Sequence, residues 1–81
     1  MKLKDTVSLM LSGDYKERFM AEYHQLHERF AGLSSMVEKW DAGTLDFTPT
    51  CPRSTYDMQK RAMVDYLAVL EARAVMEGVE L

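Results

Sequence analysis

A run of apolar residues spaced alternately four and three positions apart constrains the fold most. Its members are Phe19, Tyr23, Leu26, Phe30, Leu33, Val37 and Trp40. This spacing is a heptad seam, which is typical of one amphipathic helix packed against a partner helix. It predicts a helix over residues 14–40, about 40 Å long at 1.5 Å per residue. Asp14 followed by Glu17 resembles a capping box at the start of that helix.

A second long helix is predicted over residues 54–78. Its apolar face consists of Tyr56, Met63, Leu67, Leu70 and Ala74. Ser54 or Cys51 is the expected N-terminal cap, with Pro52 in the first turn. Gly78 is the expected left-handed residue after the last turn, with Val79 packing back on Ala74.

An ordered loop over residues 41–53 is predicted to join the two helices. Gly43 suits a left-handed position that ends the first helix. Pro49 and Pro52 hold the residues before them in extended conformations. Ahead of the long helices, Leu3, Val7, Met10 and Leu11 predict a short N-terminal helix within residues 1–12. The expected fold is therefore all-α, an antiparallel two-helix hairpin with a short N-terminal helix in a single domain of residues 1–81.

The size of the chain favours self-association. Below about 70–80 residues one core rarely stabilises a fold by itself, and this chain has 81 residues and one cysteine. An intrachain disulfide is therefore excluded. Several apolar residues also fall off the two seams, and we expect the N-terminal helix and neighbouring protomers to cover them, which predicts a homo-oligomeric helical bundle. They are Met20, Met36, Met58, Val64, Val69, Val75 and Met76.

Charge and hydropathy exclude several partners. The formal net charge is −3, and no block of lysine or arginine appears, so nonspecific binding to nucleic acid is disfavoured. A helix-turn-helix repressor needs a short turn and a basic recognition helix, so we expect no DNA partner. No apolar run reaches the length of about 20 residues that a membrane span needs, and the N-terminus does not resemble a signal peptide. The expected setting is a reducing cytoplasm, without a membrane partner.

The loop and the start of the last helix form the candidate ligand site. A helix N-terminus favours phosphate, and hydroxyls and an arginine add donors. Aromatic residues beside them suit stacking on a base, and lysines add positive charge. The expected ligand-binding residues are Thr48, Thr50, Arg53, Ser54, Tyr56, Trp40, Lys39 and Lys60. The alternative, that the threonines and Ser54 only cap and brace a turn, remains open.

Other reactive residues predict little chemistry. His24, His27 and Glu28 share one helix face but lack a recognised metal motif, and we expect them to be solvated or to face a partner. Cys51 is expected to pack rather than react, because no histidine is placed to serve it. No paired-carboxylate, phosphate-loop or triad motif is visible. We therefore expect no catalysis, no metal and no cofactor.

Several strings of residues resemble a group of small helical proteins of gut-bacterial phages and prophages, related to an uncharacterised crAss-like phage protein. The resemblance spans residues 15–81, and the string Phe47-Thr48-Pro49-Thr50-Cys51-Pro52 is its most specific part. The other strings include Tyr15-Lys16-Glu17-Arg18-Phe19, Glu38-Lys39-Trp40-Asp41-Ala42-Gly43-Thr44-Leu45, Tyr66-Leu67, Leu70-Glu71 and Glu77-Gly78. The resemblance implies a phage origin and the cytoplasm of an infected bacterial host.

In size, helix pattern and need to oligomerise, the chain is also similar to viral hairpin sponges of the anti-CBASS and anti-Thoeris type. That similarity implies a phage anti-defence protein that sequesters a cyclic nucleotide or a cyclic ADP-ribose-type signal without turning it over. The alternative is a helical protein-interaction module that inhibits a host protein or serves as an assembly adaptor. The wide apolar helix faces motivate this alternative.

Overall fold

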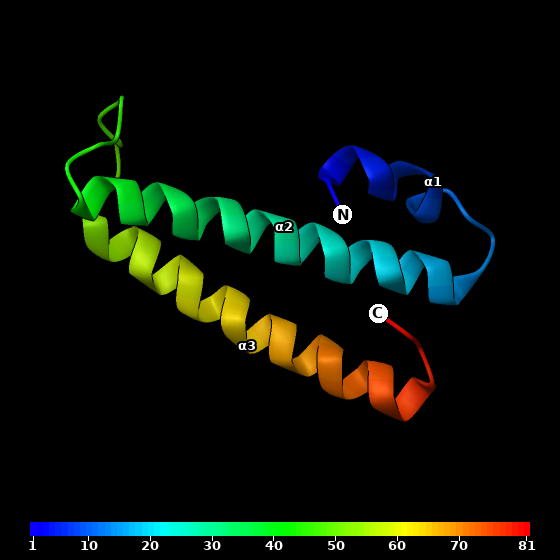
Figure 1. Ribbon diagram of the computed structural model, residues 1–81. Coiled ribbons are helices and arrows are strands. Elements are labelled where there is room, and N and C mark those ends of the chain that lie inside the picture. Colours follow the sequence, from blue (N-terminus) through cyan, green and yellow to red (C-terminus); the bar gives the residue numbers. More distant parts are fainter.

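The computed structural model describes all of residues 1–81 and is entirely helical, without strands. A 3-10 turn, η1 (Leu3–Thr6), runs directly into the short helix α1 (Val7–Met10). Two long helices follow, α2 (Tyr15–Asp41) and α3 (Arg53–Glu77). They form the predicted antiparallel hairpin, with α2 lying between the N-terminal segment and α3 (Figure 1).

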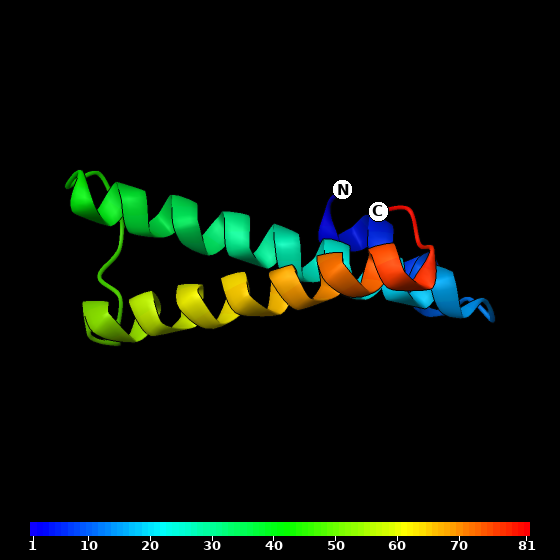
Figure 2. The same ribbon diagram turned by 90° about the horizontal axis from the view of Figure 1, so that it is seen from below.

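The molecule is elongated. Its principal extents are 43 × 24 × 17 Å, and the radius of gyration is 15.0 Å. A globular chain of this length has a radius of gyration of about 12 Å. Only 8 of the 81 residues are buried. The second view confirms a long, thin pair of helices rather than a closed bundle (Figure 2).

The best-packed part of the hairpin lies where α2 begins and α3 ends. Phe19 and Leu70 are 2% and 0% exposed, and they form one cluster with Ala74 and Val79. The predicted contact of Val79 on Ala74 is confirmed by this cluster. Burial of these side chains stabilises this end of the hairpin through the hydrophobic effect.

Both long helices end as glycine-terminated Schellman motifs. Gly43 and Gly78 have φ values of 74° and 70°, which are costly for any residue with a Cβ. The Thr44 amide donates to the Lys39 carbonyl at 2.9 Å, and the Val79 amide donates to the Ala74 carbonyl at 2.8 Å. The predicted helix ends at Gly43 and Gly78 are therefore confirmed.

The start of α2 is capped differently from the prediction. The Asp14 side chain accepts a hydrogen bond from the Lys16 amide at 2.9 Å. Glu17 does not reach back to the Asp14 amide, because the Ser12 hydroxyl takes that place. The hydroxyl accepts from the Asp14 amide at 3.0 Å and donates to the Glu17 carboxylate at 2.9 Å.

The start of α3 has no side-chain cap. The helix begins at Arg53, with Pro52 in the capping position and no side-chain hydrogen bond to the first turn. Ser54 therefore lies inside the helix, and the prediction that Ser54 or Cys51 caps it was wrong. The extended φ and ψ of Pro52, −58° and 150°, already set the direction in which the chain enters the helix.

The N-terminal segment is not the single amphipathic helix that the spacing predicts. Its buried residue is Thr6, at 0% exposure, whereas Leu3, Val7 and Met10 are 39–47% exposed. The Thr6 hydroxyl donates to the Leu3 carbonyl at 2.7 Å and accepts from the side-chain amide (Nε2) of Gln25 at 3.0 Å. A polar anchor on α2, rather than an apolar stripe, therefore holds this segment.

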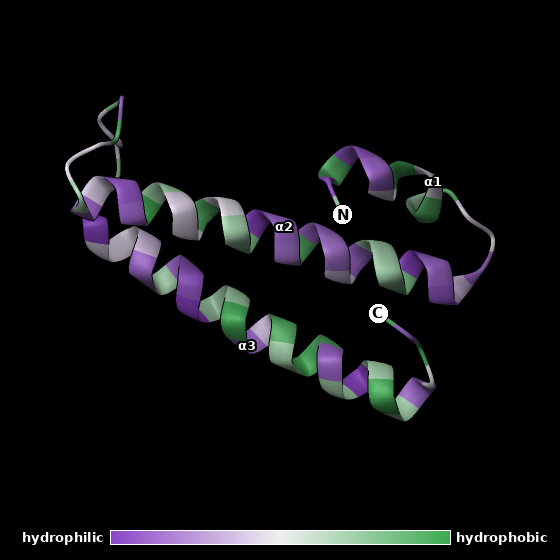
Figure 3. Ribbon diagram, viewed as in Figure 1, coloured by the Kyte–Doolittle hydropathy of each residue, from purple (hydrophilic) through white to green (hydrophobic).

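The outer face of α3 remains uncovered, although the N-terminal helix was expected to help cover it. The N-terminal segment contacts α2 only. Met58, Val69 and Met76 are 72%, 55% and 76% exposed, and Val64 and Val75 are also exposed. Hydrophobic residues gather along the C-terminal half of α3 (Figure 3).

Tyrosine–glutamate hydrogen bonds tie α2 to α3 along the hairpin. Tyr15 donates to Glu77 at 2.8 Å, and Tyr23 donates to Glu71 at 3.0 Å. Tyr66 donates in the opposite direction, from α3 to Glu22. Three glutamates therefore join the two helices by accepting hydrogen bonds from tyrosine hydroxyls. No helix is long and apolar enough to cross a membrane.

Candidate functional site

Arg53, the arginine of the sequence-predicted site, is bound by carboxylates at the loop end of the hairpin. Its Nε and Nη2 atoms donate to the two carboxylate oxygens of Asp41 at 3.2 Å and 3.0 Å. Its Nη1 atom donates to Asp57 one turn further along α3. The Arg53 bond lowers the pKa of Asp41, and the two carboxylates raise the pKa of Arg53. The guanidinium therefore braces the end of α2 against the start of α3.

Two aromatic side chains complete this brace. The Trp40 and Tyr56 rings meet edge to face, with centroids 5.9 Å apart at 73°. The Arg53 guanidinium lies 5.8 Å from the Trp40 ring centroid, within the range of a cation–π contact. A hydrogen bond with Cys51 raises the pKa of Tyr56. The structure thus brings together three predicted site residues, and each one contacts another in the cluster.

The remaining predicted site residues lie around the brace. Thr48, Thr50 and Ser54 are exposed, and their hydroxyls have no partner in the chain. The charge of Lys60 helps to lower the pKa of Asp41, which places Lys60 near the same carboxylate. Ligand binding by the loop residues remains a prediction.

Lys39 lies at a different place. It lines a hollow of about 410 Å³ between the end of α2 and the loop, together with Met36 and Phe47. The structure therefore does not group Lys39 with Arg53 and Tyr56. The sequence placed these residues together because Lys39 is adjacent to Trp40, but neighbouring residues of a helix point about 100° apart.

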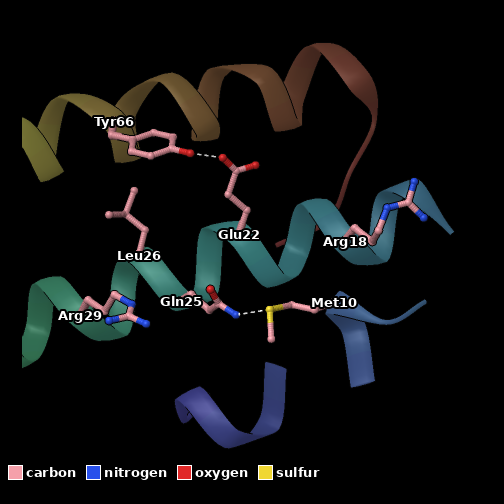
Figure 4. A pocket seen from close by; sticks show the side chains of 7 residues that line it. All are labelled: Met10, Arg18, Glu22, Gln25, Leu26, Arg29 and Tyr66. Carbon is pink, nitrogen blue, oxygen red and sulfur yellow. Dashed lines mark hydrogen bonds between the residues drawn. The ribbon is translucent and has the colours of Figure 1, made fainter. Parts of the chain in front are cut away.

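A groove that the sequence did not predict lies on the other half of the hairpin. Its volume is about 330 Å³, within the range of small-molecule sites. The floor is a stripe of α2 formed by Arg18, Glu22, Gln25 and Arg29. Tyr66 of α3 overhangs one side of this stripe and Met10 of α1 lies on the other, so three segments of the chain meet here (Figure 4).

Hydrogen bonds position the polar side chains of the groove. Arg18 donates from Nη1 to the Ser12 carbonyl at 2.8 Å, which leaves its other N–H groups free. Gln25 donates to Thr6 at 3.0 Å and to the sulfur of Met10 at 2.7 Å, so its carbonyl oxygen remains available. The Tyr66 hydroxyl donates to Glu22. This bond raises the pKa of Tyr66, and the phenol stays protonated at neutral pH.

Arg29 is the least engaged cation of the groove. It forms no ion pair, and its side chain makes no hydrogen bond within the chain. The sequence contains a signal for this, because no carboxylate stands three or four residues from Arg29 in either direction. The side chains at those positions belong to Gln25, Leu26, Gly32 and Leu33.

The histidines and the cysteine do not form a metal centre. No group of three or more histidine, cysteine, aspartate or glutamate side chains is arranged to hold a metal ion. Burial lowers the pKa of His24, aided by the positive charges of the N-terminus and His27. Cys51 is exposed in the loop. His27 lines a third hollow with Phe30, Leu67 and Glu71.

These features define a class of protein, a small helical hairpin with open grooves lined by both polar and apolar side chains. The chain belongs to the Sequestin family, whose family model matches residues 13–76. The matched range contains all of α2, the loop and all of α3 except its last residue, Glu77. The family name points to the sequestration of a molecule. Neither a curated protein nor a solved structure matches the chain.

Proposed function

We propose that this protein is a phage anti-defence sponge. It binds a cyclic nucleotide or a cyclic ADP-ribose-type immune signal, in the cytoplasm of the infected bacterial host, and holds it without turning it over. Membership of the Sequestin family over residues 13–76 is the observation that carries this proposal. A phage origin related to the crAss-like group, and assembly into a homo-oligomer, belong to the same proposal.

The groups on the surface suit recognition of such a signal. Guanidinium groups hold phosphates, and exposed phenols stack on bases. Both kinds of group line the α2 groove, where Arg18 and Arg29 accompany Tyr66, a residue that is 43% exposed. The residues expected from the sequence, Thr48, Thr50 and Ser54, offer hydroxyl donors at a second place.

Titration calorimetry with the full chain tests the proposal. The panel contains cyclic mono-, di- and trinucleotides and cyclic ADP-ribose isomers, with AMP and linear ADP-ribose as controls. We expect at least one cyclic compound to bind, and mass spectrometry to recover it unchanged after the protein is denatured. Absence of binding by every compound would contradict the proposal, and recovery of a cleaved product would contradict sequestration without turnover.

A second candidate function is a protein-interaction module. The observation that favours it is the uncovered apolar face of α3, where Met58, Val69 and Met76 are more than half exposed. Pull-down from host lysate distinguishes the two functions. A stoichiometric protein partner, together with no small-molecule binding in calorimetry, would favour the interaction module.

A further inference from the structure

We propose that the α2 groove, rather than the loop, is the binding site for the sequestered ligand, and that the ligand carries two phosphoryl groups. The inference rests on the proposed sequestering function and assigns its site. It concerns Arg18, Arg29, Gln25, Glu22 and Tyr66, which line one groove but were not expected to act together.

Positive charge is more available in the groove than at the loop end of the hairpin. Arg53 at the loop end already donates to two carboxylates, and a phosphate would have to displace Asp41 from a two-point contact. Arg29 has no such partner, and Arg18 gives one N–H to a backbone carbonyl. Binding a phosphate at the groove therefore breaks no ion pair. The groove is the place where the chain offers two guanidinium groups at the lowest cost.

The charged groups follow a definite order along the groove. Arg18 and Arg29 are eleven residues apart, which corresponds to about 16 Å along a helix axis. Glu22 and Gln25 stand between them on the same face of α2 (Figure 4). Along the helix axis, the order of side-chain groups is therefore a cation, an anion, an amide and a second cation. A ligand with phosphoryl groups towards both ends, and hydroxyl or amino donors between them, complements this order.

The groove also offers apolar surface for the non-polar part of a ligand. Tyr66 is 43% exposed, and its hydroxyl is fixed by the bond to Glu22. Leu26 and Met10 add apolar surface across the groove. A planar base can stack on the ring while its ribose hydroxyls donate to the Glu22 carboxylate. A compact anion such as inorganic phosphate gains none of these contacts and is repelled by Glu22.

The experiment compares matched variants in calorimetry with the cyclic nucleotide that binds the wild-type chain best. Arg29→Gln removes a side chain without partners, and the double variant Arg18→Gln with Arg29→Gln removes both cations. We expect about a tenfold loss of affinity for each arginine, since hydrogen bonds to charged groups are the strong ones. Arg61→Gln, which also removes one exposed positive charge, and Thr48→Val with Thr50→Val in the loop should bind as the wild type does. Inorganic phosphate should not compete.

The outcomes separate the site from the function. Wild-type binding that survives in the double variant would overturn the groove while leaving sequestration intact. Equal losses in Arg29→Gln and in Arg61→Gln, which remove one positive charge each, would reduce the effect to net charge and would also overturn it. If no compound binds the wild-type chain, both proposals fail. Circular dichroism verifies that each variant remains helical, and Arg29→Gln keeps the test valid if the double variant unfolds.

Discussion

At the scale of single residues, the polar side chains decide how the hairpin closes. Arg53 joins the two helices at the loop end, and the phenol of Tyr15 joins them at the other end by donating to Glu77. The sequence predicts which apolar residues face the seam, because the heptad spacing fixes one face of each helix. It does not predict these polar partners. Arg53 and Asp41 stand on opposite sides of a loop whose path the spacing leaves open.

Protonation of Asp41 and Glu77 should loosen both ends. Hydrogen bonds from Arg53 lower the pKa of Asp41 below its ordinary 3.8, and those from Tyr15 and Arg73 lower the pKa of Glu77 below its ordinary 4.5. As pH falls, the unfolded chain therefore binds protons first, so the stability these carboxylates provide above their ordinary pKa values is lost as pH falls through the folded-state values.

We expect the melting temperature, followed by circular dichroism, to fall below about pH 5. The double variant Asp41→Asn with Glu77→Gln should melt at a lower temperature at pH 7 and show a flatter acid dependence. Asp46→Asn, at an exposed carboxylate without a hydrogen-bond partner, is the matched control. An equally steep acid dependence in the double variant would show that other groups drive the transition.

At the scale of elements, the ends of the long helices were more predictable from sequence than their beginnings. Glycine is the residue that adopts a left-handed conformation at low cost, so Gly43 and Gly78 mark the ends directly. A helix start has several competing signals. Asp14 was correctly predicted as the cap of α2, but the Glu17 carboxylate accepts a hydrogen bond from the Ser12 hydroxyl and does not reach the Asp14 amide. At α3, Pro52 occupies the capping position, although serine is the residue type with the stronger capping preference.

Two glycine substitutions should change the free energy of unfolding in opposite directions. Gly43→Ala should lower the free energy of unfolding by about 1 kcal/mol, because the position has a left-handed φ of 74°. Gly32→Ala should raise it by up to about 1 kcal/mol, because Gly32 lies inside α2 and a Cβ there meets no atom within 4 Å. Urea denaturation measures both. Destabilisation by Gly32→Ala would indicate that another chain packs against this position in solution.

At the scale of the whole molecule, the chain is a thin hairpin with a small core and a long apolar face. The sequence predicts this imbalance, since the apolar residues of α3 are too many for one seam. What the sequence does not predict is that the N-terminal segment leaves that face open. The segment is fixed by Thr6 to the opposite side of the hairpin from α3, on α2. The candidate groove follows from that placement, so it could not be read from the spacing of residues alone.

The open face leads us to expect self-association. Met58, Ala62, Val69, Ala72 and Met76 recur along α3 with spacings of four, seven, three and four, which resembles a second heptad seam interrupted at Asp65. Light scattering coupled to size-exclusion chromatography should find a mass above 9.3 kDa that depends on concentration. Val69→Glu with Met76→Glu should shift the protein to the monomer, whereas Gln59→Glu should not. A wild-type monomer at all concentrations would contradict this expectation.

Met10 differs from the other residues that line the groove in its relation to the family match. The family match begins at residue 13, so the floor and the Tyr66 side of the groove fall within the shared region while the Met10 side does not. The first twelve residues rest on α2 and make no contact with α3. Of the residues that line the proposed site, Met10 alone lies outside the matched range. A substitution at Met10 therefore alters the groove without altering the region that the family model matches.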